Sequence, residues 1–225
     1  MFTLLSIEGN IGAGKSTFVR MLRRTLEEGG REVIFLEEPV QEWEKVVDEA
    51  GVNIISKFYS QPRLYSFAFQ MTAFITRLSM LRRAIRDHPD AVIVSERCLD
   101  ADRRVFATLL RDQGKLEPML YAVYNSWFEE FEAEWRGGRQ VRLYLRAPPD
   151  VCLGRVAKRM REGEQAIDLD YLERCHAYHE AWLCGEESGG RVVTLDASVD
   201  MPQTEEAYAP WMKVVRRMID EDGDV

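Results

Sequence analysis

The chain has 225 residues, a length that suits one large α/β domain and is short for two. Hydrophobic residues make up 46% of it, which is enough to fill the core of such a domain. Its formal net charge of −8 speaks against a nucleic-acid polymer as a partner, since phosphate backbones attract basic surfaces. No apolar run approaches the roughly 20 residues of a membrane span, and no targeting leader opens the chain. Together with four cysteines in no CxxC pattern, these features predict a cytoplasmic protein with reduced thiols and no membrane partner.

Short apolar runs alternate with helical patterns along the chain. The runs that read as strands are 3–7, 33–36, 91–94, 141–145 and 192–195, and the longest helical pattern covers about 62–86. Each run is nearly all apolar, as expected for parallel strands covered by helices on both faces. We therefore predict a single α/β domain over 1–225, with a doubly wound sheet of about five parallel strands and an acidic tail at 220–225. Ligands are expected at the carboxyl ends of the strands.

A phosphate-binding motif follows the first predicted strand. Residues 9–16 fit G-x-x-x-x-G-K-[ST] and lead into a helical pattern over 18–26. In such a P-loop the backbone N–H groups close around phosphate oxygens, the lysine reaches the β/γ-phosphates and the serine hydroxyl holds Mg²⁺. The alternative is a chance match in an ordinary strand–turn–helix, which the two flanks disfavour. The predicted phosphate-binding residues are Gly9, Asn10, Ile11, Gly12, Ala13, Gly14, Lys15, Ser16 and Thr17.

Charged residues follow the second and third predicted strands, at 37–39 and 95–97. Phosphoryl transfer to a hydroxyl needs a group that orients the attacking oxygen and accepts its proton, and positive charge near the moving phosphoryl. We predict Glu38 for the first role and Arg97 for the second, with a bidentate contact through which Arg97 orients Glu38. Glu96 is predicted to bind Mg²⁺ beside the P-loop serine. The alternative is a purely structural Glu–Arg pair.

Three residues of a strongly hydrophobic helical stretch, 66–77, share one face although two of them are polar. Gln70, Ala73 and Arg77 have the spacing i, i+3 and i+7. A buried Gln needs partners for its amide donor and acceptor, which the edge of a nucleobase provides, and Phe69 could stack on the base. The spacing leaves open a second interpretation, a helix–helix interface with one internal hydrogen bond.

A basic segment lies late in the chain. Arg155, Lys158, Arg159 and Arg161 fall within 155–164, after a predicted strand and helix. Basic side chains on a mobile loop at this place can close over transferring phosphates, so we predict a lid at about 158–168.

Other chemistries find little support in the sequence. His176 and His179 match no zinc-protease signature and are interpreted as ordinary helix residues. A GTPase would need an N-K-x-D motif, which is absent, and its D-x-x-G motif occurs only in the acidic tail.

With these residues assembled, the chain resembles the deoxynucleoside kinase family of deoxycytidine, deoxyguanosine and mitochondrial thymidine kinases. The resemblance runs from residue 4 to about 211. Besides the P-loop, it rests on Glu-Pro-Val-x-x-Trp at 38–43, Phe-Gln at 69–70, Glu-Arg at 96–97, Arg-x-Arg at 159–161 and Leu-x-Tyr-Leu at 169–172. It implies transfer of the γ-phosphate of Mg-ATP, or of another nucleoside triphosphate, to the 5′-hydroxyl of a deoxyribonucleoside in the salvage of DNA precursors. It also implies a homodimer.

The resemblance further implies the role of each matched residue. Glu38 looks like the base for the 5′-hydroxyl, with Arg97 beside it, and Gln70 looks like the residue that reads the base edge. Tyr59 and Glu164 match a pair that grips the sugar 3′-hydroxyl. The base-packing aromatics would be Phe69 and Phe106, the arginines on the donor phosphates Arg159 and Arg161, and the further nucleoside-binding residues Trp43, Ile55 and Phe58.

Two positions bear on base preference. Arg77 and Asp102 match the Arg and Asp of the deoxycytidine and deoxyguanosine kinases, whereas thymidine-accepting relatives carry smaller or apolar residues. A charged pair there would penalise the thymine methyl and favour cytosine or a purine. The chain departs from the family at Phe58, Cys98 and Gly163. The nearest alternative is a nucleoside monophosphate kinase, such as a thymidylate kinase, whose acceptor phosphate the acidic residues of this site would repel.

Overall fold

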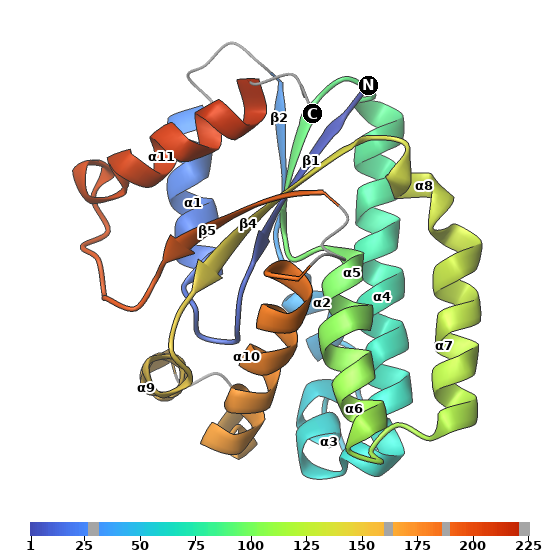
Figure 1. Ribbon diagram of the computed structural model, residues 1–225. Helices are drawn as coiled ribbons and strands as arrows, with labels where there is room; N and C mark the ends of the chain where they lie inside the picture. Colours follow the sequence, from blue (N-terminus) through green and yellow to red (C-terminus); the bar gives the residue numbers. More distant parts are fainter. Residues whose placement is uncertain (27–31, 160–163, 186–189, 221–225) are drawn as a thin grey trace.

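A parallel β-sheet forms the centre of the molecule, in a computed structural model that describes residues 1–26, 32–159, 164–185 and 190–220 (Figure 1). The strands are Thr3–Glu8 (β1), Val33–Leu36 (β2), Val92–Glu96 (β3), Arg139–Arg146 (β4) and Arg191–Asp196 (β5). Their order is β2-β3-β1-β4-β5, and all neighbouring pairs in this sheet are parallel. The predicted α/β class with five parallel strands is confirmed.

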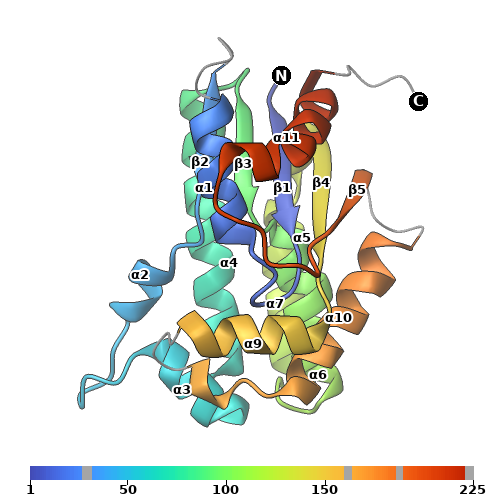
Figure 2. The same cartoon turned by 90° about the vertical axis from the view of Figure 1, so that its left-hand side faces the viewer.

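Helices cover both faces of the sheet (Figures 1 and 2). One face is covered by α1 (Lys15–Leu26) and α11 (Glu205–Asp220), the other by α4 (Pro62–Asp87) and α7 (Pro118–Phe131). The remaining helical segments are α2 (Val40–Glu44), α3 (Ile54–Ser60), α5 (Leu99–Ala101), η1 (Asp102–Ala107), α6 (Thr108–Asp112), α8 (Ala133–Arg136), α9 (Pro149–Arg159), η2 (Glu164–Ala166) and α10 (Leu169–Leu183). None of those in the described ranges has the length and apolar character that crossing a bilayer requires.

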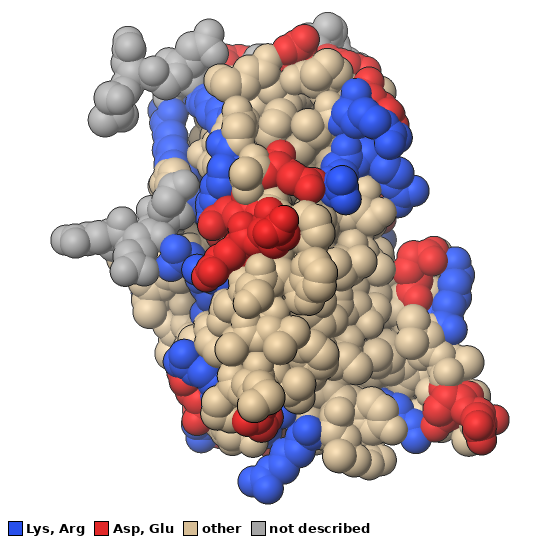
Figure 3. Space-filling view, turned by 90° about the vertical axis from the view of Figure 1, so that its right-hand side faces the viewer, with Lys and Arg blue, Asp and Glu red and all other residues tan. Residues whose placement is uncertain are grey.

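The two largest apolar clusters, one on each side of the sheet, hold these layers together. On one side Phe18 of α1 packs against Tyr208 and Trp211 of α11. On the other side Phe74 of α4 contacts Phe128 of α7. The outer face of α7 presents a broad area without charged side chains (Figure 3).

The long helix α4 carries polar groups on its inward face. It begins with Pro62, whose missing N–H suits the first helical turn, where that donor has no intrahelical partner. Its buried residues recur at helical spacing: Ser66, Gln70, Ala73, Phe74, Arg77, Leu78, Leu81 and Ala84. Because Gln70 and Arg77 lie within this stripe, α4 delivers an amide and a guanidinium to the interior.

Four of the five strands are longer than the apolar runs that predict them, and β2 has the predicted bounds. Ser95 and Glu96 belong to β3 rather than to the loop after it, because β1 pairs with β3 in the register Ser6↔Ser95 and Ile7↔Glu96. Ladder hydrogen bonds therefore hold polar residues in the strand that hydrophobicity alone would exclude. The helix after the P-loop begins earlier than predicted, at Lys15. Of the predicted acidic tail, Asp220 ends α11 and 221–225 lie outside the described residues.

Candidate active site

A cavity of about 600 Å³ lies where β1, β2, β3 and β5 end, a volume typical of small-molecule sites. The sequence-predicted residues that line it are Ile11, Gly12, Ala13, Gly14, Lys15, Ser16, Thr17, Glu38, Trp43, Ile55, Phe58, Tyr59, Phe69, Gln70, Arg77, Glu96, Arg97, Asp102, Phe106, Arg159 and Glu164. Gly9 and Asn10 are buried beside it, and Arg161 lies outside the described residues. The fold thus gathers side chains from widely separated segments around one space.

The P-loop requires glycine at two positions for steric reasons. Gly9 has φ +144°, and a Cβ there would lie 2.6 Å from the carbonyl oxygen of Leu145. Gly12 has φ +83°, and its Cβ would lie 2.5 Å from the carbonyl oxygen of Cys152. Both positions combine a left-handed backbone with close backbone contact, so no other residue fits without moving the loop.

Lys15 lies buried inside the loop. Its Nζ donates to the carbonyl oxygens of Gly9 (3.3 Å) and Asn10 (2.9 Å). Burial, together with the charge of Arg97, lowers the pKa of Lys15 to about 7. An anion bound in the loop would stabilise the charged ammonium form of Lys15.

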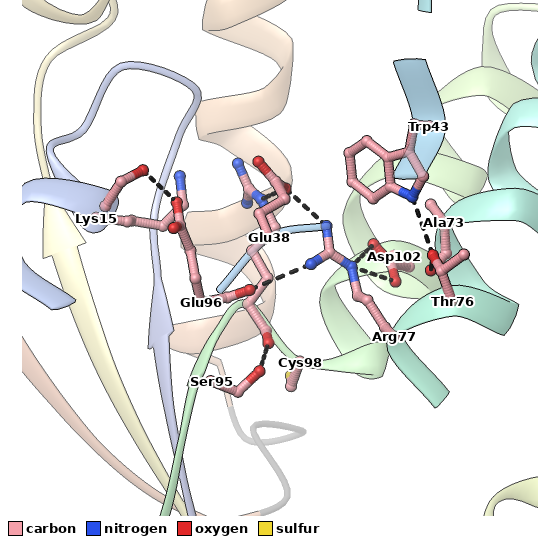
Figure 4. A network of polar contacts seen from close by, with 12 residues as sticks. Lys15, Glu38, Trp43, Ala73, Thr76, Arg77, Ser95, Glu96, Cys98 and Asp102 are labelled. Carbon is pink, nitrogen blue, oxygen red and sulfur yellow. Dashed lines mark hydrogen bonds and ion pairs between the residues drawn. The ribbon is translucent and has the colours of Figure 1, made fainter. Parts of the chain in front are cut away.

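Glu38, which is partly buried, forms an ion-pair chain with the buried Arg77 and Asp102 (Figure 4). Arg77 Nη2 donates to Glu38 Oε1 at 2.6 Å, and Arg77 Nε donates to Asp102 Oδ2 at 3.0 Å. Arg77 Nη1 donates to the Glu96 carbonyl oxygen at 3.2 Å. All three nitrogens of this guanidinium are therefore engaged, and one side chain joins the α4 stripe to the end of β2.

The predicted bidentate contact between Arg97 and Glu38 is wrong. Arg97 Nε lies 3.5 Å from Glu38 Oε1 in a single contact, because Arg77 reaches the same oxygen from α4 and takes the short hydrogen bond. Burial alone would raise the pKa of Glu38, but the positive charges of Arg77 and Arg97 outweigh it and hold the pKa at about 2. Glu38 is therefore ionised at neutral pH.

Two oxygen groups suited to Mg²⁺ meet beside the P-loop. Ser16 Oγ donates to Glu96 Oε1 at 2.8 Å. Within the described ranges, no group of three or more His, Cys, Asp or Glu side chains could hold a metal without further ligands. Hard oxygen donors in small number fit Mg²⁺, which takes the rest of its ligands from water and substrate phosphates.

The far end of the cavity combines an unpaired amide with aromatic walls. Gln70 Oε1 is buried and has no hydrogen-bond partner in the described parts of the chain. Phe69 stacks on Phe58, with ring centroids 4.7 Å apart, and meets Trp43 edge-on at 5.5 Å. A buried acceptor without a partner calls for a ligand or a water molecule, so a planar ligand with a donor edge fits here.

Arg159 and Glu164 pair with each other across the mouth of the cavity. Arg159 Nε and Nη2 donate to the two carboxylate oxygens of Glu164 at 2.7 and 2.5 Å. Tyr59 lies nearby; its burial and the Glu164 carboxylate raise its pKa, so the hydroxyl keeps its proton and can donate. The predicted placing of the basic residues on a loop is wrong, because Arg155, Lys158 and Arg159 lie within α9. Lys158 and Arg155 bind Asp200 there.

Two parts of the site escaped the sequence analysis. The segment after β5 adds Ala197, Val199, Asp200, Met201 and Gln203 to the cavity wall. Residues directly after parallel strands are expected to lie at the ligand site, and the same expectation applied to the fifth strand would have predicted this segment. The second is His179, which is not an ordinary helix residue: it is fully buried, and its Nε2 lies 3.4 Å from Arg97 Nη1. Helical spacing alone carries no signal for that contact.

Comparison with known proteins agrees with this geometry. The family model described as deoxynucleoside kinase matches residues 5–220. The deoxycytidine kinase of Rattus norvegicus is 33% identical over 237 residues, covering 93% of this chain and 89% of that protein. The deoxycytidine kinase of Homo sapiens is 35% identical, covering 80% and 74%, and the mitochondrial deoxyguanosine kinase of Xenopus laevis is 32% identical, covering 80% and 72%.

Proposed function

Because this chain belongs to the deoxynucleoside kinase family, and is therefore an enzyme that phosphorylates the 5′-hydroxyl of deoxynucleosides, we propose that it prefers deoxycytidine and purine deoxynucleosides to thymidine. The donor is a nucleoside triphosphate, and we propose that it is ATP with Mg²⁺. The product is the nucleoside 5′-monophosphate, formed in the salvage of DNA precursors.

The observation that carries phosphoryl transfer to a hydroxyl is the ionised Glu38, which contacts two arginines and shares the cavity wall with the P-loop. The deoxynucleoside hydroxyl donates to the Glu38 carboxylate, which aims the oxygen at the γ-phosphorus. With a pKa near 2, this carboxylate is a weak base and accepts the proton late, once the new P–O bond has formed and made the hydroxyl acidic. Its main contribution is orientation.

Positive charge surrounds the transferring group. The P-loop N–H groups and Lys15 hold the donor phosphates, and Arg97 faces the phosphoryl group as it moves. Arg159 would release Glu164 to bind the donor phosphates, leaving Glu164 and Tyr59 for the sugar 3′-hydroxyl. Ser16 and Glu96 would hold the Mg²⁺, which neutralises phosphate charge when bound.

The Arg77–Asp102 pair supports the base preference. Both side chains are buried beside Gln70 in the cavity wall, and the amide of Gln70 can pair with cytosine or, after a flip, with thymine. Discrimination must then come from the surroundings of the base. A thymine methyl pushed against a desolvated ion pair would gain no apolar contact there.

The alternative of a nucleoside monophosphate kinase gains no support from the matched family or from these relatives. The acceptor phosphate of such an enzyme would face the carboxylates of Glu38 and Glu164, which repel it.

We also propose a homodimer that forms through α4 and α7, and a cytoplasmic location. Exposed apolar side chains on these helices support the dimer, and they include Ile75, Leu120, Val123 and Trp127. The location is supported by the cysteines, which are free thiols, as expected in a reducing compartment.

Steady-state assays with the four natural deoxynucleosides and Mg-ATP test the proposal. We expect the highest kcat/KM among deoxycytidine and the purine deoxynucleosides, and turnover of deoxycytidine monophosphate near background. A preference for thymidine would overturn the assigned base preference, and turnover of the monophosphate alone would overturn the assigned acceptor.

A further inference from the structure

Arg97 is held in an unusual backbone conformation. Its φ is +66°, a left-handed backbone value that residues other than glycine rarely adopt, and it lies directly after β3. Its N–H donates to the Ile7 carbonyl oxygen, and its own carbonyl accepts from Ser95 Oγ. The backbone thus sends the guanidinium back across the P-loop, where its orientation depends on its contacts.

The hydrogen bonds of this guanidinium divide into two sets. Nη1 donates to the Gly9 carbonyl oxygen at 2.9 Å and faces His179 Nε2 at 3.4 Å, so both of its hydrogens have acceptors. Nε faces Glu38, and in the described part of the chain Nη2 makes no hydrogen bond. With Nη1 fixed, Nε and Nη2 are turned to the cavity.

His179 is itself fixed by its surroundings. Its Nδ1 lies 2.6 Å from the carbonyl oxygen of Cys175, which can only accept, so Nδ1 carries the proton and Nε2 offers its lone pair to Arg97. The ring lies parallel to Tyr144 at 6.2 Å and edge-on to Phe106 at 6.1 Å. Burial and the charge of Arg97 lower the pKa of His179 well below its usual value, which keeps the ring a neutral acceptor.

We propose that His179 is a positioning residue for phosphoryl transfer: its Nε2 accepts from Arg97 Nη1 and thereby holds the other guanidinium nitrogens toward Glu38 and the transferring phosphoryl group. The inference rests on the proposed function, since it concerns the orientation of Arg97, the residue proposed to face the transferring phosphoryl group. It also gives α10 a part in catalysis, because this helix supplies the acceptor.

The test compares wild type with His179→Phe, which keeps an aromatic ring but removes the acceptor. We expect kcat for deoxycytidine to fall about 10-fold to 100-fold, since small displacements of a catalytic group have costs of this order. The KM for deoxycytidine should stay within about threefold, because His179 does not itself line the cavity and the Phe ring preserves the edge-on contact with Phe106, which does. His179→Gln, whose side-chain oxygen can accept from Arg97, should recover part of the lost kcat.

The matched control is His176→Phe, on the same helix and one turn earlier, which should change kcat little. A double-mutant cycle with Arg97→Lys measures the coupling between His179 and Arg97 in kcat. A purely structural role of His179 would give no such coupling. In the Arg97→Lys background, His179→Phe should lower kcat by less than about threefold, since lysine lacks the planar guanidinium whose orientation the two acceptors fix.

Three results would overturn the inference: an unchanged kcat in folded His179→Phe, an equal loss in the Arg97→Lys background, or no recovery in a folded His179→Gln. Thermal melting of each variant identifies those that are folded, and if His179→Phe is not, His179→Leu, which also lacks an acceptor, replaces it in the cycle. Wild-type turnover of deoxycytidine is measured first. If wild type shows none, the proposed function fails; if wild type is active and the cycle shows no coupling, only the inference about His179 fails.

Discussion

Arg77 is the residue that ties base recognition to the reacting end of the site. It donates to Asp102 beside the base pocket and to Glu38 beside the P-loop. Sequence spacing places it on one face with Gln70 but gives no sign of the second contact, because Glu38 lies on another element. A change made to alter base preference at this position therefore also changes the setting of the carboxylate.

For Arg77→Met combined with Asp102→Ala, we expect thymidine to gain about 1–3 kcal/mol relative to deoxycytidine in kcat/KM, the usual value of accommodating a methyl-sized group. Removing both residues avoids leaving one buried charge unpaired. We also expect kcat to fall for both nucleosides, since Glu38 loses its 2.6 Å hydrogen bond. Asp102→Asn, which leaves Arg77 in place, is the control for the loss in kcat. An active, folded double variant with an unchanged thymidine preference would contradict this assignment and direct attention to Phe58.

Replacing Glu38 with Gln should lower kcat by about 10²–10⁴ while deoxynucleoside binding largely survives, because the neutral amide fills the same space but orients the hydroxyl less strongly and cannot accept its proton. Binding by isothermal titration and turnover by a coupled assay separate the two effects. A variant within a few-fold of wild type in kcat would remove Glu38 from this role.

The low pKa of Glu38 also has a consequence for stability. Since its pKa falls from 4.5 to about 2 on folding, the ion pair stabilises the protein above pH about 4.5, and this contribution is lost as pH falls toward 2.

Lys15 should take up a proton when the donor binds. Its pKa is about 7 in the free protein, so above pH 7 the free side chain is largely neutral, whereas bound phosphates favour the ammonium. Proton uptake should thus rise from near zero at pH 6 toward one at pH 8.5, and donor affinity should weaken as pH rises. Titration calorimetry in buffers of different ionisation enthalpy measures this uptake. Lys15→Arg, which stays charged throughout, should show none, and pH-independent uptake in wild type would contradict the assignment.

At the scale of elements, α10 links the P-loop to the rest of the site. Asn10 Nδ2 donates to the Leu172 carbonyl oxygen at 2.8 Å in a buried hydrogen bond, while Oδ1 accepts from the N–H of Ile11. The same helix carries His179. Its start is fixed by Asp168, whose carboxylate accepts from the N–H of Tyr171.

Asn10→Ala should therefore lower the free energy of unfolding by about 1–3 kcal/mol, since a buried carbonyl loses its donor. Donor affinity should fall more than nucleoside affinity, because the P-loop loses its anchor. Denaturant unfolding and separate titrations with each substrate measure both, with Thr25→Ala, at the other end of α1 and outside the cavity wall, as the control. Equal losses for the two substrates would contradict a local effect on the loop.

How far the sequence predicts each element depends on how local its cause is. The P-loop is set by glycines that only one backbone shape accommodates, so a motif of eight residues was enough. The apolar runs located all five strands, yet they missed Ser95 and Glu96 because pairing with β1 is not local. The basic residues Arg155 and Arg159 lie in α9 rather than on a loop, and their partners Asp200 and Glu164 come from outside that helix, where local sequence gives no sign of them. Contacts between distant elements, such as Arg97 with His179, leave no trace in spacing.

At the scale of the whole molecule, one apolar stripe remains without a partner in the described chain. On α7, Leu120, Val123 and Trp127 follow at i, i+3 and i+7, and Trp127 is 47% exposed although its ring stacks on Phe131. Figure 3 shows a broad uncharged area on the side of the molecule where α7 lies. Large apolar patches of this kind mark interaction surfaces.

We expect wild type to sediment as a dimer of the 26.1 kDa chain at micromolar concentration, and Trp127→Glu to sediment as a monomer, since an interface cannot bury the new charge without a partner. Val47→Glu is the control, because Val47 is 54% exposed but lies between α2 and α3, away from this face. A monomeric wild type, or a dimer that survives Trp127→Glu, would contradict the proposed interface. Apart from Gly9 and Asn10, which are buried beside it, the described residues proposed to act on the substrates line one cavity within a single chain. A folded monomeric variant should therefore keep most of its turnover of deoxycytidine, which separates the role of the interface from that of the active site.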